Sequence, residues 1–99
     1  MGYHSLRLCA GGGAYEAVPD PRLRLDLSEC GKRLGEADVS VVDARVMLII
    51  QLERETTLSR DGRVLIKTRD STEAAAVFER LRQLLGLPPV EPRTGTGPS

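Results

Sequence analysis

The chain has 99 residues, which is enough for one small domain with a single hydrophobic core. Lys plus Arg and Asp plus Glu number 14 each, so the near-zero net charge disfavours nucleic acid and anionic membranes as partners. One Phe, two Tyr and no Trp leave few side chains on which nucleic-acid bases could stack. Nucleic-acid binding is therefore only an alternative function, and no feature of the sequence predicts a cofactor.

The sequence contains neither an apolar run of membrane-spanning length nor the arrangement of a signal peptide. We therefore expect a cytoplasmic protein that does not associate with membranes. Because the cytosol is reducing, Cys9 and Cys30 are expected to be free thiols.

The amino-terminal region is predicted to be extended. Residues 5–9 alternate as in a short strand, Gly11, Gly12 and Gly13 interrupt it, and residues 14–18 form a second extended piece. We predict that the glycines form a bulge or bend within one edge strand, or a flexible turn. A phosphate-binding loop is disfavoured, because neither the required Lys and Ser or Thr nor a helix follows.

A first helix is predicted over residues 27–34, after an alternating approach over residues 22–26. Leu27, Cys30 and Leu34 share one face of it, so Cys30 is expected to pack as a small apolar side chain. Gly35 is a suitable end for this helix.

Two strands follow, over residues 38–43 and 45–53. The second strand is apolar on both faces, which is typical of a strand in the middle of a sheet. If helices cover one sheet face, then the second apolar set, which contains Met47 and Ile49, is exposed, covered by a tail or buried against another molecule. In the alternative interpretation, the long stems of Arg63 and Lys67 shield this face.

The pair Asp61 and Gly62 predicts a hairpin with a two-residue turn. Such a turn would place Ser59 opposite Val64 and Leu58 opposite Leu65.

A second helix begins after Asp70, which can cap the first turn, while Glu73 can reach back in a capping box. Gly86 and Pro88 end it. The Pro/Gly-rich residues 87–99 are predicted to be a disordered tail, so the domain comprises residues 1–86. The apolar face of this helix contains Ala74, Val77, Phe78, Leu81, Leu84 and Leu85.

The predicted order is strand, helix, four strands, helix. We expect an α+β domain in which one antiparallel sheet carries both helices on one face. This order is similar to one half of the TATA-binding-protein-like fold, and a ferredoxin-like fold is the alternative.

Several segments also resemble one family. They are Leu8-Cys9 before the glycines, Leu25-Asp26-Leu27 opening a helix that ends at Arg33-Leu34-Gly35, and Asp61-Gly62-Arg63 followed by Ile66-Lys67-Thr68. Together they are similar to the small C-terminal domain of some ThiF/MoeB-type adenylyltransferases, which activate ubiquitin-like sulfur-carrier proteins. The 99 residues contain no counterpart of the adenylating domain, so the resemblance implies an accessory domain and transfers no catalytic residue.

We expect a non-enzymatic interaction domain, linked through this resemblance to sulfur-carrier (thiamin or molybdopterin) metabolism. It would self-associate, as in a homodimer, or bind a protein such as a ubiquitin-like sulfur carrier through its open sheet face. The residues predicted to make that contact are Met47, Ile49, Leu65, Arg63 and Lys67.

Thiol-dependent sulfur transfer through Cys9 is the alternative, because this residue lies at a strand end beside flexible glycines and near His4 and Arg7. No Ser-His-Asp or Cys-His-Asp arrangement can be argued from the sequence, because the single histidine, His4, lies in an amino terminus expected to be frayed. His4, Cys9 and Cys30 lack the paired spacing of a zinc site, so no metal ligands are predicted.

Overall fold

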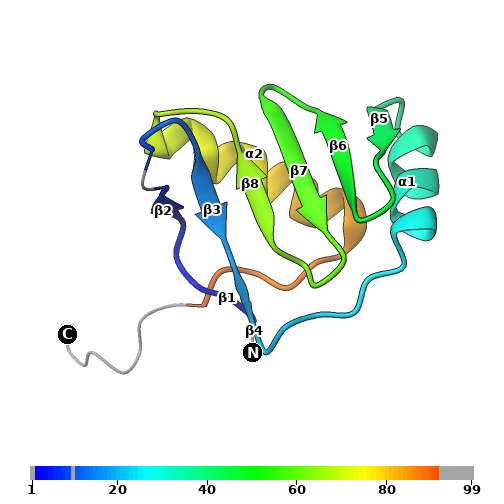
Figure 1. Cartoon of the computed structure of the whole chain (residues 1–99), viewed down its shortest axis with the longest axis horizontal. Helices are drawn as coiled ribbons and strands as arrows, with labels where there is room; N and C mark the ends of the chain where they lie inside the picture. The colour runs from blue at the N-terminus through cyan, green and yellow to red at the C-terminus, as the bar shows by residue number, and fades with distance from the viewer. Residues whose placement is uncertain (1, 10, 92–99) are drawn as a thin grey trace.

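The computed structural model describes residues 2–9 and 11–91, which form a small α+β domain with two helices and antiparallel sheets (Figure 1). None of the helices in these residues has the length and apolar character needed to cross a membrane. In chain order the elements are β1 (Gly2–Tyr3), β2 (Arg7–Leu8), β3 (Tyr15–Ala17), β4 (Pro19–Asp20), α1 (Leu27–Glu36), β5 (Ser40–Asp43), β6 (Met47–Gln51), β7 (Glu55–Ser59), β8 (Val64–Ile66) and α2 (Ser71–Leu85).

The main sheet has six antiparallel strands in the order β2-β3-β8-β7-β6-β5. The four strands predicted between the helices are present as β5 to β8, and three hairpins join them in sequence. Strands β1 and β4 form a separate two-stranded sheet. The main sheet therefore has β2 at one edge and β5 at the other.

The core lies between the helices and one face of the main sheet, the covered face. Figure 1 shows α2 running behind the strands and α1 beside β5. Alternate residues of the strands point toward the helices, because successive side chains of a strand face opposite sides. The central core residues from strands and helices are Leu48, Ile50, Leu58, Val64, Ile66, Leu27, Leu34, Val77, Phe78 and Leu81.

The glycine-rich segment joins two strands and does not bend a single edge strand. The amide of Cys9 donates to the Ala14 carbonyl at 2.8 Å, and the amide of Gly12 donates to the Cys9 carbonyl at 2.8 Å. Gly12 has a φ of +74°, a left-handed conformation that glycine adopts without steric cost. Strands β2 and β3 are thus a hairpin, and β3 lies inside the sheet because it also pairs with β8.

The β7–β8 hairpin turns at Asp61 and Gly62 as predicted, but its loop has three residues, 60–62. Ser59 pairs with Arg63, whose carbonyl accepts from the Ser59 amide at 2.9 Å. Gly62 has a φ of +93°, as expected for a turn closed by a left-handed glycine.

The longer loop shifts every predicted pair of this hairpin by one residue. Leu58 pairs with Val64 and Thr57 with Leu65, whereas the two-residue turn paired Leu58 with Leu65. The observed register is favoured because it places the fully buried Leu58 and Val64 side by side on the covered face.

Both helices begin at aspartate caps. Asp26 accepts a hydrogen bond from the Glu29 amide, and Asp70 accepts from the amides of Thr72 and Glu73. Glu73 does not complete the predicted capping box. Its carboxylate instead accepts from the Thr68 hydroxyl at 2.7 Å, and the Thr68 hydroxyl accepts from the Asp70 amide at 3.1 Å.

The segment after α2 differs from the predicted tail. Leu87 is buried, and Val90 forms a parallel bridge with Tyr3. The Tyr3 amide donates to the Pro89 carbonyl at 2.9 Å, and the Glu91 amide donates to the Tyr3 carbonyl at 2.8 Å. Residues 87–91 therefore belong to the domain, because β1 supplies hydrogen-bond partners for a Pro-rich segment. The rest of the predicted tail, residues 92–99, lies outside the described residues.

Candidate functional site

The candidate site is the face of the main sheet opposite the helices, which we call the open face. In the view of Figure 1, the strands lie in front of α2 and the described chain places no helix over this face. The strand register aligns one residue from each strand in a row across it. From β2 to β5 this row contains Arg7, Glu16, Leu65, Thr57, Ile49 and Val42.

The half of the open face formed by β5, β6 and β7 carries uncharged side chains except for Glu55, at the start of β7. Met47 and Ile49 project from β6 and are half-buried, and Met47 pairs with Ser59 of β7. Val42 on β5 is 58% exposed, and Val46 in the β5–β6 turn is 63% exposed. This half therefore presents aliphatic groups that the chain's own core does not enclose.

The other half of the open face is charged, and its charges are paired. The Glu16 carboxylate lies 3.4 Å from the Arg63 guanidinium and 3.9 Å from that of Arg7. Lys67 Nζ lies 3.1 Å from the Glu55 carboxylate. An anion would have to compete with these carboxylates for Arg63 and Lys67.

The five residues predicted to bind a partner all map to this face, but in two groups. Leu65 is half-buried in β8, and Arg63 and Lys67 lie at alternate positions on either side of it, just before and just after the strand. Met47 and Ile49 lie on β6, with β7 between the two groups. Arg63 and Lys67 therefore flank Leu65, and Met47 and Ile49 lie two strands away from them.

Sequence reasoning missed Val42 and Glu16 as members of this surface. The strand over residues 38–43 was predicted, but its alternation could not show which Val faces the core. The sequence feature that could have pointed to Glu16 is its position in the extended piece after the glycines, residues 14–18. Its proximity to Arg63 depends on the pairing of β3 with β8, which joins segments distant in sequence.

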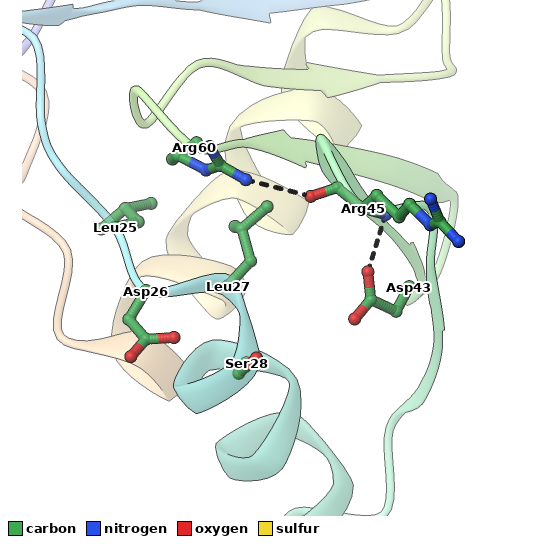
Figure 2. Close-up of a pocket in the computed structure, with 7 residues that line it drawn as sticks. All are labelled: Leu25, Asp26, Leu27, Ser28, Asp43, Arg45 and Arg60. Carbon is green, nitrogen blue, oxygen red and sulfur yellow. Dashed lines mark hydrogen bonds between the residues drawn. The ribbon is translucent and has the colours of Figure 1, made fainter.

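A pocket of about 550 Å³ opens where α1 begins, beside the β5–β6 turn (Figure 2). Arg60 Nη2 donates to the Arg45 carbonyl at 3.4 Å, and the Arg45 amide donates to the Asp43 carboxylate at 2.7 Å. Figure 2 shows the Arg45 guanidinium directed away from Arg60. The carboxylates of Asp26 and Asp43 line this pocket together with Arg60, so its lining carries both signs of charge, whereas the guanidinium of Arg45 points out of it.

The two thiols have different environments. Cys9 is half-buried at the end of the β2–β3 hairpin, and Cys30 is buried in α1. Burial, followed by the nearby Asp26 carboxylate, raises the pKa of the Cys30 thiol and so disfavours its thiolate. The two basic residues near Cys9 in the sequence both face carboxylates. His4 Nε2 lies 3.5 Å from the Asp20 carboxylate, and the Arg7 guanidinium lies 3.9 Å from the Glu16 carboxylate.

No group of three or more His, Cys, Asp or Glu within residues 2–9 and 11–91 could hold a metal ion. Buried polar side chains in the same residues are Thr56 and Thr68, and both donate hydrogen bonds, Thr56 to the Arg54 carbonyl at 2.9 Å and Thr68 to Glu73.

Comparison with known proteins finds no matching family model, no similar curated protein and no similar solved structure. The functional proposal for this chain therefore depends on its own residues and geometry.

Proposed function

We propose that this domain is a non-enzymatic interaction module that binds a protein partner through its open face. One observation carries the proposal: the helices enclose one face of the sheet, while Val42, Met47 and Ile49 stay partly exposed on the other. Fully burying one such aliphatic side chain contributes about 1.5–3 kcal/mol, so a partner that covers them would gain stability from burial alone.

The charged half of the face would set the orientation of the partner. Arg63 and Lys67 are each more than half exposed, although each is paired with a carboxylate on the same face. Exposed pairs of this kind contribute little to stability, so they can exchange one partner for another at low cost. Complementary charges on a partner would therefore act mainly on association rate and specificity.

A ubiquitin-like sulfur carrier is the partner we propose, and sulfur-carrier metabolism in the cytoplasm is the setting. The resemblance of the Asp61-Gly62-Arg63 hairpin and its flanking segments to the C-terminal domain of ThiF/MoeB-type enzymes supports this choice. The same resemblance supports a TATA-binding-protein-like arrangement of the sheet and its two helices. In this proposal the chain holds the carrier and leaves adenylation to another protein.

The test is a titration of the isotope-labelled chain with a purified ubiquitin-like sulfur carrier, followed by NMR. We expect the amides of β6, β7 and β8 to shift and those of the outer side of α2 to stay in place. Ile49→Asp should weaken binding at least about tenfold, the effect of losing one contact residue at the centre of an interface. The matched control is Ala75→Asp, an exposed position on α2.

Two results would contradict the proposal. Binding that Ile49→Asp leaves unchanged, in a variant shown to be folded by circular dichroism, would exclude the open face. A carrier that produces no shift at the highest concentration tested would exclude the proposed partner.

A further inference from the structure

The edge strand β5 has unused backbone hydrogen-bonding groups. Within residues 2–9 and 11–91 it pairs only with β6, and its pairs include Val42 with Ile49. The Ala44 amide donates to the Met47 carbonyl at 2.9 Å, so by the alternation of an antiparallel ladder Val42 also bonds to β6. The N–H and C=O groups of Val41 and Asp43 then point outward. Within the described residues, no hydrogen bond outside the β5–β6 ladder uses the backbone of either residue.

This edge lacks two of the residues, Pro and Lys, that usually prevent edge-to-edge pairing. The four residues of β5 include neither Pro nor Lys, and two of them are Val, which favours extended structure. Three of the four residues are exposed, so the strand stays accessible to solvent although α1 lies beside it. At the opposite edge, β2 has only two residues, and one is Arg7.

We propose that the β5 strands of two copies of this chain pair antiparallel and join two main sheets into one. One register uses all the outward groups. The Val39 amide already donates to the Leu34 carbonyl at 2.9 Å, so a pairing that needs this donor is disfavoured. Pairing Val41 of each copy with Asp43 of the other forms four backbone hydrogen bonds and places the two-fold axis at Val42.

This register buries the most exposed aliphatic side chain of the strand. Val42 of one copy faces Val42 of the other in a close, non-hydrogen-bonded pair on the open face. On the covered side, a hollow of about 320 Å³ lies between α1 and β5, lined in part by Ser28 and Gly31. These small residues leave room beside α1 for the side chains of an added strand.

The charges at the two ends of β5 are complementary in this arrangement. Asp38 precedes the strand and Arg45 follows it, and both have left-handed backbone conformations, with φ of 61° and 73°. Neither side chain forms an ion pair within the described residues, and Figure 2 shows Arg45 directed away from the pocket beside it. Antiparallel pairing brings Arg45 of each copy beside Asp38 of the other, so two opposite charges meet at each end.

The proposed dimer uses the strand edge and does not depend on the carrier-binding role of the open face. It would place two open faces next to each other in one continuous surface. The interface is small, so we expect a weak dimer that forms at high micromolar concentrations.

Sedimentation velocity over a concentration series from about 10 μM to 1 mM tests the proposal at the expected affinity. Val41→Pro removes an outward N–H from each copy without removing a donor to β6. We expect it to weaken dimerisation about tenfold or more, because two hydrogen bonds per dimer are lost. Val41→Ala keeps both N–H groups and is the matched control, which should dimerise like the natural chain.

A second variant tests the dimer independently, because Val41→Pro could also lower the stability of the fold. Val42→Lys changes an exposed side chain and should leave the fold intact, but it places like charges opposite each other on the two-fold axis. We expect it to abolish the dimer, while Val42→Thr, which keeps the branched shape, retains it. A monomer over the whole range, or a dimer insensitive to both Val41→Pro and Val42→Lys, would overturn the proposal. Loss of the dimer in Ile49→Asp with retention in Val41→Pro would place the contact on the open face and also overturn it.

Discussion

The Tyr3 hydroxyl donates a hydrogen bond to the Gly62 carbonyl at 2.5 Å and joins two segments 59 positions apart in sequence. Tyr3 is fully buried, and its ring meets that of Phe78 edge-on with the centroids 4.8 Å apart. The same residue bonds through its backbone to Pro89 and Glu91. Tyr3 thus connects the amino terminus, the β7–β8 turn, α2 and the carboxyl-terminal segment.

Replacing Tyr3 by Phe should lower the free energy of unfolding. The aromatic contact with Phe78 would be kept, but the Gly62 carbonyl would lose its partner in a buried setting, which costs about 1–3 kcal/mol. Urea denaturation followed by circular dichroism measures this change. Tyr15→Phe is the control, because Tyr15 is half-buried and we expect little change there. Equal stability of Tyr3→Phe and the natural chain would contradict a structural role for the hydroxyl.

The stability of the fold should decrease in alkaline solution. Burial, followed by the Asp61 carboxylate, raises the pKa of Tyr3 above its usual 10.0. The unfolded chain therefore loses this proton first, and the stabilisation, complete below about pH 10, falls by up to about 1.4 kcal/mol per pH unit above it. The raised pKa of Cys30 adds a further fall in the same direction, which begins near its usual 9.0.

Denaturation at a series of pH values measures this fall. A Tyr3→Phe variant should lose the part of the fall that Tyr3 causes, which begins near pH 10, and keep the part that Cys30 causes, whereas Tyr15→Phe should keep both. An unchanged alkaline profile in Tyr3→Phe would show that another group titrates.

The contacts of Tyr3 could not be predicted from the sequence, whereas the helices and the strands between them could. Periodicity predicted both helices and the four strands between them, because apolar spacing reports which face of an element is buried. It could not predict that Tyr3 enters the core, since the two-residue strand β1 is too short to show a period and its partners are distant in sequence. For the same reason residues 87–91 were predicted to be part of a tail.

The sequence predicted some of the residues on the open face but not their arrangement across the strands. Met47 and Ile49 were identified because a strand apolar on both sides leaves one side away from the helices. The exposed Val42 and the Glu16 partner of Arg63 depend on strand order and register. A single extra residue in the hairpin loop at Gly62 was enough to shift the predicted register by one.

Gly62→Ala should be strongly destabilising. The added Cβ would lie 2.8 Å from Leu23 Cδ1, and the φ of +93° is unfavourable for any side chain. The left-handed conformation alone costs about 1–2 kcal/mol, and the steric overlap adds to it. Gly13→Ala is the matched control, because it has open space around it and should raise the unfolding free energy by about 0.4–1 kcal/mol or leave it unchanged. Thermal and urea denaturation compare the two variants, and equal stability would show that the turn relaxes easily.

Removing the cap of α2 should destabilise the domain more than removing the cap of α1. Asp70 accepts hydrogen bonds from the amides of Thr72 at 2.9 Å and Glu73 at 3.3 Å, whereas Asp26 accepts one from Glu29 at 3.2 Å. Asp70→Ala should cost about 1–2 kcal/mol, and Asp26→Ala should cost about 0.5–1 kcal/mol.

The variant Asp70→Asn distinguishes the contribution of the capping hydrogen bonds from that of the carboxylate charge. The amide oxygen can still accept from both backbone donors, so this variant should lose only the interaction of the carboxylate with the helix dipole, about 0.3–1 kcal/mol. Hydrogen exchange at the amides of Thr72 and Glu73 should accelerate in Asp70→Ala and stay close to that of the natural chain in Asp70→Asn. If the two variants exchanged at the same accelerated rate, the carboxylate charge rather than hydrogen bonding would stabilise the first turn of α2.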